Sequence, residues 1–210
     1  MAMEKLPGLN KREILLSELN SHYLLTNQDR SHILLVLEGL KQACQIEIYN
    51  PDKTGYKSGH ENEYEQNTTD FKKTIEDLQE LFQKLNLPYH LDINHVQEED
   101  GMPAHTVAEF LIGKDQETLT KLKNVSKEVG GSEDAKIFDI PATAIDAWNN
   151  GTTKDLETLP DDIRNSEVFQ FIDFALSEDH WKEEIEFVRR RADAIKNLAP
   201  ELYAKIAASE

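Results

Sequence analysis

The 210-residue sequence contains a single cysteine, Cys44. It therefore has no intramolecular disulfide and no zinc site built from cysteines. Residues 1–5 lack the apolar centre of a signal peptide, and no run approaches the roughly 20 apolar residues that a membrane-spanning helix needs. These absences predict a cytoplasmic protein without membrane contact.

Basic side chains are also scarce. The chain has 23 Lys and Arg against 40 Asp and Glu, which gives a formal net charge of −17. Proteins that bind nucleic acids or anionic membranes use Lys and Arg to neutralise phosphates, so neither kind of partner is expected. The hydrophobic fraction of 39% is still enough for a core. We expect one domain covering residues 1–210.

Motifs that mark catalytic sites are missing as well. The sequence has no G-x-S-x-G elbow, no HExxH zinc motif, no EF-hand loop and no glycine-rich phosphate loop. Cys44 follows an apolar segment, which favours a buried structural thiol over a nucleophile. We expect no cofactor.

The clearest pattern lies in residues 105–151. It predicts a strand, a helix, a second strand and a second helix, at 106–113, 115–128, 136–140 and 141–150. Pro141 fits the first turn of the last helix, and Gly151 follows its end.

Residues upstream predict the other half of a sheet. The alternating segment 45–49 and the polar segment 91–96 read as strands on either side of an amphipathic helix ending at Leu85. Together with 105–151 they give the order β-α-β-β-α-β, which is typical of a ferredoxin-like fold. About ten residues separate the second and third strands, which suits a hairpin rather than a doubly wound sheet.

The expected fold class is therefore α+β, with additions covering the open sheet face. The expected parts are N-terminal helices at 1–44, the ferredoxin-like core at 45–150 and a helical C-terminal extension at 151–210. A homodimer formed through the open face is the alternative. Two segments stay undecided: the irregular 51–70 is either a lid or a surface loop, and the apolar 168–176 is either helix or strand.

One candidate ligand site follows from this topology. Parallel strands at 106–113 and 136–140 would bring their carboxyl ends to one sheet edge. Lys114, Asp139, Thr143 and the backbone N–H groups of Ala142 and Thr143 would then surround a small anionic ligand at a helix start. The simpler interpretation is that Asp115 and Asp139 only cap the following helices.

Histidines suggest a metal site as an alternative. His90 directly precedes the expected strand 91–96, Asp92 and His95 lie within it, and imidazole with carboxylate suits Zn²⁺. Residues 90 and 92 share a strand face, whereas 95 points to the other, so solvated polar residues are the simpler interpretation. A second group, His180 with Glu183 and Glu184, has helical spacing but also fits an ordinary charged helix face.

Two functions remain from the sequence. The first is a module without catalytic activity that binds a small ligand or a protein partner. The alternative is a metal-dependent, hydrolase-like enzyme that uses His90, Asp92 and His95, with residues 51–70 as its lid.

Overall fold

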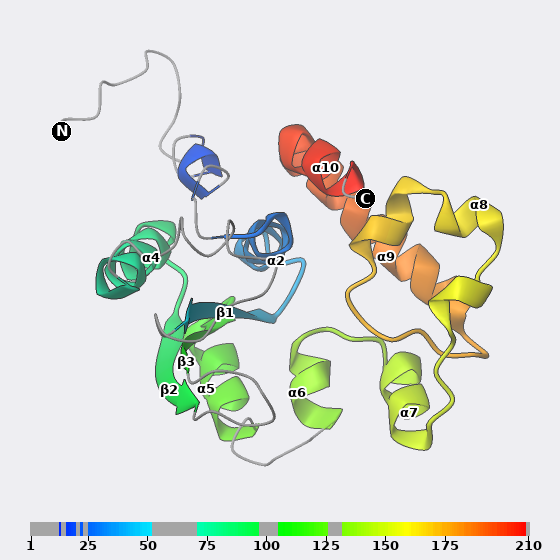
Figure 1. Ribbon diagram of the computed structural model, residues 1–210, viewed down its shortest axis with the longest axis horizontal. Coiled ribbons are helices and arrows are strands. Elements are labelled where there is room, and N and C mark those ends of the chain that lie inside the picture. Colours follow the sequence, from blue (N-terminus) through cyan, green and yellow to red (C-terminus); the bar gives the residue numbers. More distant parts are fainter. Residues whose placement is uncertain are drawn as a thin grey trace.

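The computed structural model describes residues 13, 16–19, 22, 25–51, 71–96, 105–125 and 132–208. In these residues the protein has a mixed α+β fold, in which α2 and α4 lie on one side of a three-stranded antiparallel sheet and α5 on the other (Figure 1). The coarse fold class predicted from the sequence is confirmed. Residues 52–70, which make up most of the segment left open between a lid and a surface loop, lie outside the described residues.

The helices and strands follow one another in a simple order. They are α2 (Asn27–Leu37), β1 (Ala43–Pro51), α4 (Phe71–Leu85), β2 (Tyr89–Val96), β3 (His105–Gly113), α5 (Gln116–Val125), α6 (Ser132–Ile137), α7 (Ala142–Asn150), η1 (Leu156–Thr158), α8 (Asp161–Arg164), η2 (Glu167–Phe171), α9 (Trp181–Leu198) and α10 (Pro200–Ala207).

Helix α2 begins at a capping box. Thr26 Oγ1 accepts a hydrogen bond from the Asp29 backbone N–H, and Asp29 Oδ2 accepts one from the Thr26 backbone N–H. The helix stops at Leu37, two residues before Gly39 adopts a left-handed φ of +70°. The chain then turns into β1 at Ala43, so the expected N-terminal helices do not extend to residue 44.

The sheet has the order β1-β3-β2, and both neighbouring pairs are antiparallel. One face packs against α2 and α4 through the largest core cluster, in which Phe82 and Phe110 meet edge to face with ring centroids 5.4 Å apart. The other face packs against α5, where Leu111 meets Leu119 and Leu122. The alternation of side chains in β1 and β3 thus produces two separate apolar layers.

The ferredoxin-like topology is not supported, because residues 136–140 do not form its fourth strand. They form the end of α6 and the turn after it. Phe138 N–H donates to the Asp134 carbonyl at 2.9 Å, and Ile140 N–H donates to the Ala135 carbonyl at 3.0 Å. A short apolar run does not distinguish strand from helix, and here acidic residues in the first turn and Lys136 in the last favour the helix.

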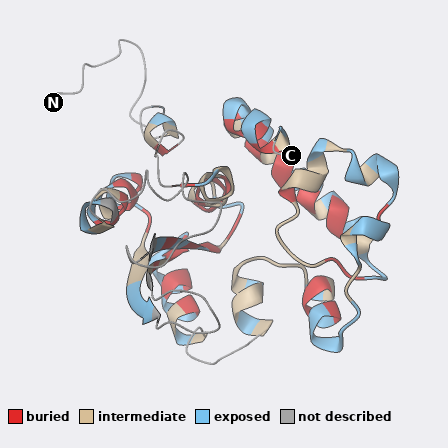
Figure 2. Ribbon diagram, viewed as in Figure 1, coloured by how far each residue is buried: buried red, intermediate tan, exposed pale blue. Residues whose placement is uncertain are grey.

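The C-terminal helices pack on α2 rather than on the sheet. Leu34 and Leu35 of α2 join an apolar cluster with residues of α9 and α10, among them Val188, Ile195 and Leu202. Helix α2 is therefore buried on two sides, between the sheet and the C-terminal layer (Figure 2). No helix among the described residues is long and apolar enough to cross a membrane.

The segment 168–176 is neither a long helix nor a strand. The 3₁₀ helix η2 ends at Phe171, and an irregular connection leads from Ile172 to α9. Phe171 stacks on Tyr203 of α10 with ring centroids 5.0 Å apart. This connection places Asp173 between α2 and α9.

Candidate functional site

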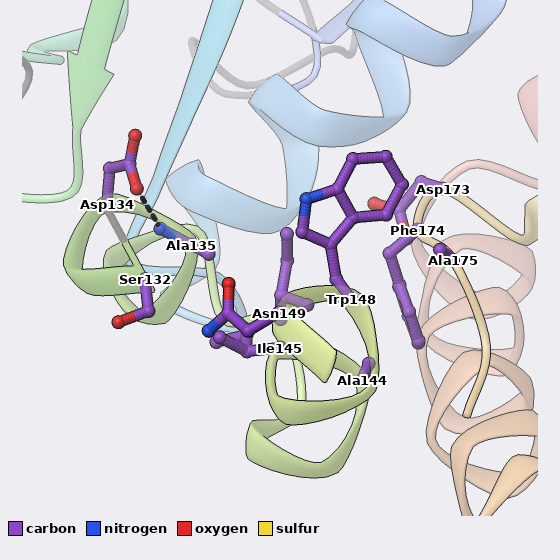
Figure 3. A pocket seen from close by; sticks show the side chains of 11 residues that line it. Ser132, Asp134, Ala135, Ala144, Ile145, Trp148, Asn149, Asp173, Phe174 and Ala175 are labelled. Carbon is purple, nitrogen blue, oxygen red and sulfur yellow. Dashed lines mark hydrogen bonds between the residues drawn. The ribbon is translucent and has the colours of Figure 1, made fainter. Parts of the chain in front are cut away.

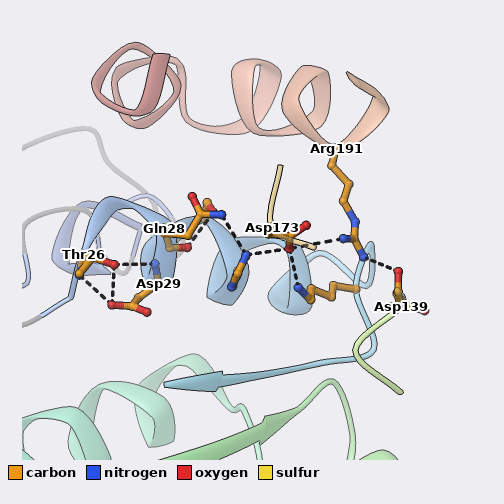
Figure 4. A network of polar contacts seen from close by, with 9 residues as sticks. Thr26, Gln28, Asp29, Asp139, Asp173 and Arg191 are labelled. Atoms are coloured by element: carbon orange, nitrogen blue, oxygen red, sulfur yellow. Dashed lines mark hydrogen bonds and ion pairs between the residues drawn. The ribbon is translucent and has the colours of Figure 1, made fainter. Parts of the chain in front are cut away.

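A buried ionic cluster surrounds Asp173. Its Oδ2 atom lies 3.1 Å from His32 Nε2, 3.2 Å from Lys41 Nζ and 3.7 Å from Arg191 Nη1. Only 5% of the Lys41 side chain and 10% of the Arg191 side chain are exposed. Arg191 also donates through Nη2 to the Asp139 carbonyl at 3.2 Å (Figure 4). The Asp173 carboxylate thus links α2, the turn before β1 and α9, and Arg191 connects it further to the turn after α6.

The partners of Asp173 keep it ionised. Burial alone would raise the pKa of this carboxyl group, but the hydrogen bond from His32 and the charges of Lys41 and Arg191 hold the pKa well below its usual range. All three partners approach Oδ2. Oδ1 is buried and has no hydrogen-bond partner, so it keeps an unused acceptor.

A pocket of about 340 Å³ lies beside this cluster, between α6, α7 and residues 173–175 (Figure 3). Most of its wall is apolar. Its lining residues are Ser132, Asp134, Ala135, Ile140, Ala144, Ile145, Trp148, Asn149, Asp173, Phe174 and Ala175. Small pockets with apolar walls and a few polar groups are the usual form of ligand sites.

Trp148 is the unusual side chain of this wall. Its side chain leaves α7 toward Phe174 and Asp173, yet 70% of the residue remains exposed. The buried residues of α7 are Ala144, Ile145 and Ala147. Trp148 therefore contributes little to the core, and its indole is accessible to a bound molecule.

A smaller pocket of about 180 Å³ shares Ile140 and Asp173 with the first. Cys44 forms part of its wall, and burial raises the pKa of this thiol to about 12. The thiol therefore stays protonated at neutral pH, which argues against a nucleophile. The prediction of a buried thiol is confirmed.

Several residues predicted to bind an anion form hydrogen bonds with other parts of the protein. Asp139 Oδ2 accepts a hydrogen bond from the Gln42 backbone N–H, and the Lys114 backbone N–H donates to the Gln42 carbonyl at 2.8 Å. These two predicted residues therefore both adjoin Gln42. Ala142 is exposed at the start of α7. Asp115 caps α5 as expected, accepting from the Thr118 N–H at 2.8 Å, whereas Asp139 caps no following helix.

Thr143 contacts a buried carboxylate instead of an open site. Its hydroxyl group donates to Glu184 Oε1 at 2.6 Å, and Glu184 Oε2 accepts from the Ser177 backbone N–H at 2.7 Å. Glu184 is 1% exposed, whereas Glu183 on the same helix and His180 just before it are exposed. The possible metal group at the start of α9 is therefore divided between core and surface.

The residues of the alternative metal site lie on both faces of β2. His90 Nε2 is 3.2 Å from Asp92 Oδ2, while His95 Nδ1 is 2.9 Å from Thr106 Oγ1. Within the described ranges, no group of three or more His, Cys, Asp or Glu side chains is arranged to hold a metal ion.

Sequence reasoning missed Asp173 and Trp148. A signal existed for Asp173, because it is the only charged residue between Val168 and Leu176, and a charge in a buried run needs a partner. No such signal existed for Trp148, whose spacing from Ala144 and Ile145 predicts burial.

Comparisons of the chain with models of protein families, with curated proteins and with solved structures found no match.

Proposed function

We propose that the protein is a binding module for a small ligand, which occupies the pocket between α6, α7 and residues 173–175. The observation that carries this proposal is Trp148. Trp148 is 70% exposed, its indole lines an apolar pocket, and such a ring supplies a large contact area to a bound molecule.

The ionic cluster supports the same proposal because it makes one wall of the pocket rigid. Asp173 lines the pocket and is fixed by partners from α2, β1's preceding turn and α9. A pocket wall held in place before binding loses little conformational freedom when the ligand arrives. The volume of about 340 Å³ is near the lower end for ligand pockets, which favours a small molecule.

Saturation-transfer NMR with a library of small aromatic fragments tests the proposal. We expect hits that bind the wild-type protein and change its tryptophan fluorescence. Trp148→Ala should weaken these hits about tenfold or more, because it removes one wall. Unfolding curves of both proteins should remain similar, since the indole is mostly exposed.

Trp148→Phe provides the matched variant, because it keeps an aromatic face and should retain most of the binding. The proposal fails if the library gives no hits, or if the hits bind Trp148→Ala as tightly as the wild type.

A further inference from the structure

The pocket between α6, α7 and residues 173–175, called the Trp148 pocket below, has charged side chains of one sign in its wall, which bears on the chemical class of its ligand. The charged side chains that line it are Asp134 and Asp173. Among the described residues, no lysine, arginine or histidine lines this pocket. An anionic ligand would therefore be repelled by the Asp134 carboxylate, whereas a cationic ligand would be attracted to it.

Asp134 is the carboxylate that is free to interact with a ligand. Its Oδ1 accepts a hydrogen bond from the adjacent Ala135 N–H at 2.8 Å, and it forms no ion pair within the part of the chain that the structure describes. The charge of Asp173 is already balanced by Lys41 and Arg191. Asp173 therefore adds no uncompensated charge to the pocket wall.

Trp148 and Phe174 add aromatic faces to the same pocket. The negative face of an aromatic ring attracts a cation, and tryptophan does so most strongly. An ammonium group gains from this contact, whereas a carboxylate or phosphate is repelled. The whole chain, at −17, also raises the local concentration of cations and lowers that of anions.

We propose that the ligand of this pocket is an organic cation, namely an ammonium group attached to a small apolar or aromatic body. This inference rests on the proposed binding function. The body occupies the apolar wall between α6 and α7, and the ammonium group lies between the Trp148 indole and the Asp134 carboxylate.

A matched series of three probes tests the inference: phenethylamine, 2-phenylethanol and phenylacetate, which share one body and carry a cationic, a neutral and an anionic group. Their affinities for the full chain are measured by titration calorimetry in low salt. We expect phenethylamine to bind about tenfold or more tightly than 2-phenylethanol, and phenylacetate to bind most weakly.

Two variants test whether the preference for a cationic probe arises from the carboxylate in the pocket. Asp134→Asn should weaken phenethylamine about fivefold and leave 2-phenylethanol unchanged, because it removes the charge and keeps the shape. Asp146→Asn is the control, because Asp146 is an exposed carboxylate of α7 that does not line the pocket. It should change the affinity of neither probe.

The outcomes separate the inference from the function on which it rests. If Trp148→Ala weakens all three probes and the wild type binds them equally, or prefers phenylacetate, the pocket binds ligands and the cation inference is wrong. If Asp146→Asn weakens phenethylamine as much as Asp134→Asn does, general attraction explains the binding and the inference is again wrong. If Trp148→Ala weakens none of the probes, the proposed function itself fails.

Discussion

Replacing Asp173 by asparagine should destabilise the fold strongly. The substitution keeps the shape of the side chain and removes its negative charge, which leaves Lys41 and Arg191 with exposed side-chain fractions of 5% and 10% and without this counterion. Removing one partner from a buried ion pair costs about 3–5 kcal/mol, because the remaining charge stays desolvated. We expect Asp173→Asn to lower the free energy of unfolding at pH 7 by an amount in this range.

The pH dependence of this loss follows from the direction of the pKa shift. The folded protein holds the pKa of Asp173 below its usual range, so the ionised carboxylate stabilises the fold at every pH above the unfolded value of about 4. This contribution is lost as the pH falls below that value toward the lower folded pKa. The difference between wild type and Asp173→Asn should therefore be fully present at pH 7 and become smaller below about pH 4.

Urea unfolding followed by far-ultraviolet circular dichroism measures both effects, and an exposed ion pair provides the control. Glu76 Oε1 lies 3.9 Å from Lys72 Nζ, with 61% and 85% of the two side chains exposed. Glu76→Gln should cost no more than about 0.5 kcal/mol. If Asp173→Asn costs no more than this control, or costs as much at pH 3 as at pH 7, the buried charge of Asp173 does not stabilise the fold.

Two further substitutions test the sheet. A Cβ atom at Gly113 would lie 2.8 Å from the Leu119 backbone nitrogen, so Gly113→Ala should lower the free energy of unfolding by about 1–3 kcal/mol in a urea titration; an unchanged midpoint would contradict the close approach. Glu109 faces Glu47 and Asp92 across the sheet. Its pKa is raised mainly by burial and further by these two negative charges, while His90 acts in the opposite direction. Glu109→Gln should therefore stabilise the protein by up to about 1 kcal/mol at pH 7, and this gain should vanish near pH 4, where the wild-type carboxyl group is protonated; a gain that persists there would exclude a charge effect.

Elements with a long periodic pattern were predictable from the sequence. Helix α4 has apolar residues at helical spacing over 15 residues and occupies Phe71–Leu85 as expected. Strands β1 and β3 extend the predicted segments by one to two residues at their ends. In these elements the local pattern and the tertiary packing require the same conformation, so the sequence alone was sufficient.

The segment 136–140 shows why the fourth strand was predicted wrongly. Its three apolar residues fit a strand that continues the sheet, but they also fit the last turn of a short helix. Ile137 and Phe138 pack on the cluster of Leu119 and Leu122 beneath the sheet, so they are partly buried without joining it. Burial was therefore predictable, whereas the conformation depended on backbone hydrogen bonds within α6 that no apolar pattern specifies.

The candidate site was less predictable than the fold, because its residues are far apart in the chain. Asp173 meets Lys41 across 132 positions of sequence, and no spacing rule connects them. The charge proposed for the ligand differs from the one that the sequence suggested for the same reason, namely that contacts between distant residues follow no spacing rule. The sequence suggested an anion at Lys114 and Thr143, whereas Thr143 lies against the buried Glu184 and the pocket beside α7 carries carboxylates.

The two central residues of the site have separate roles, which determines how its function is to be tested. Asp173 lines the pocket and also holds three parts of the fold together, so a loss of binding in Asp173→Asn would not distinguish a missing contact from a loosened structure. Trp148 is mostly exposed, and its removal leaves the ionic cluster in place. Ligand that binds only the folded state adds about 2.7 kcal/mol of stability at 100 times its Kd. A ligand of the Trp148 pocket should therefore stabilise the wild type against unfolding and lose this effect in Trp148→Ala, while both proteins without ligand unfold alike.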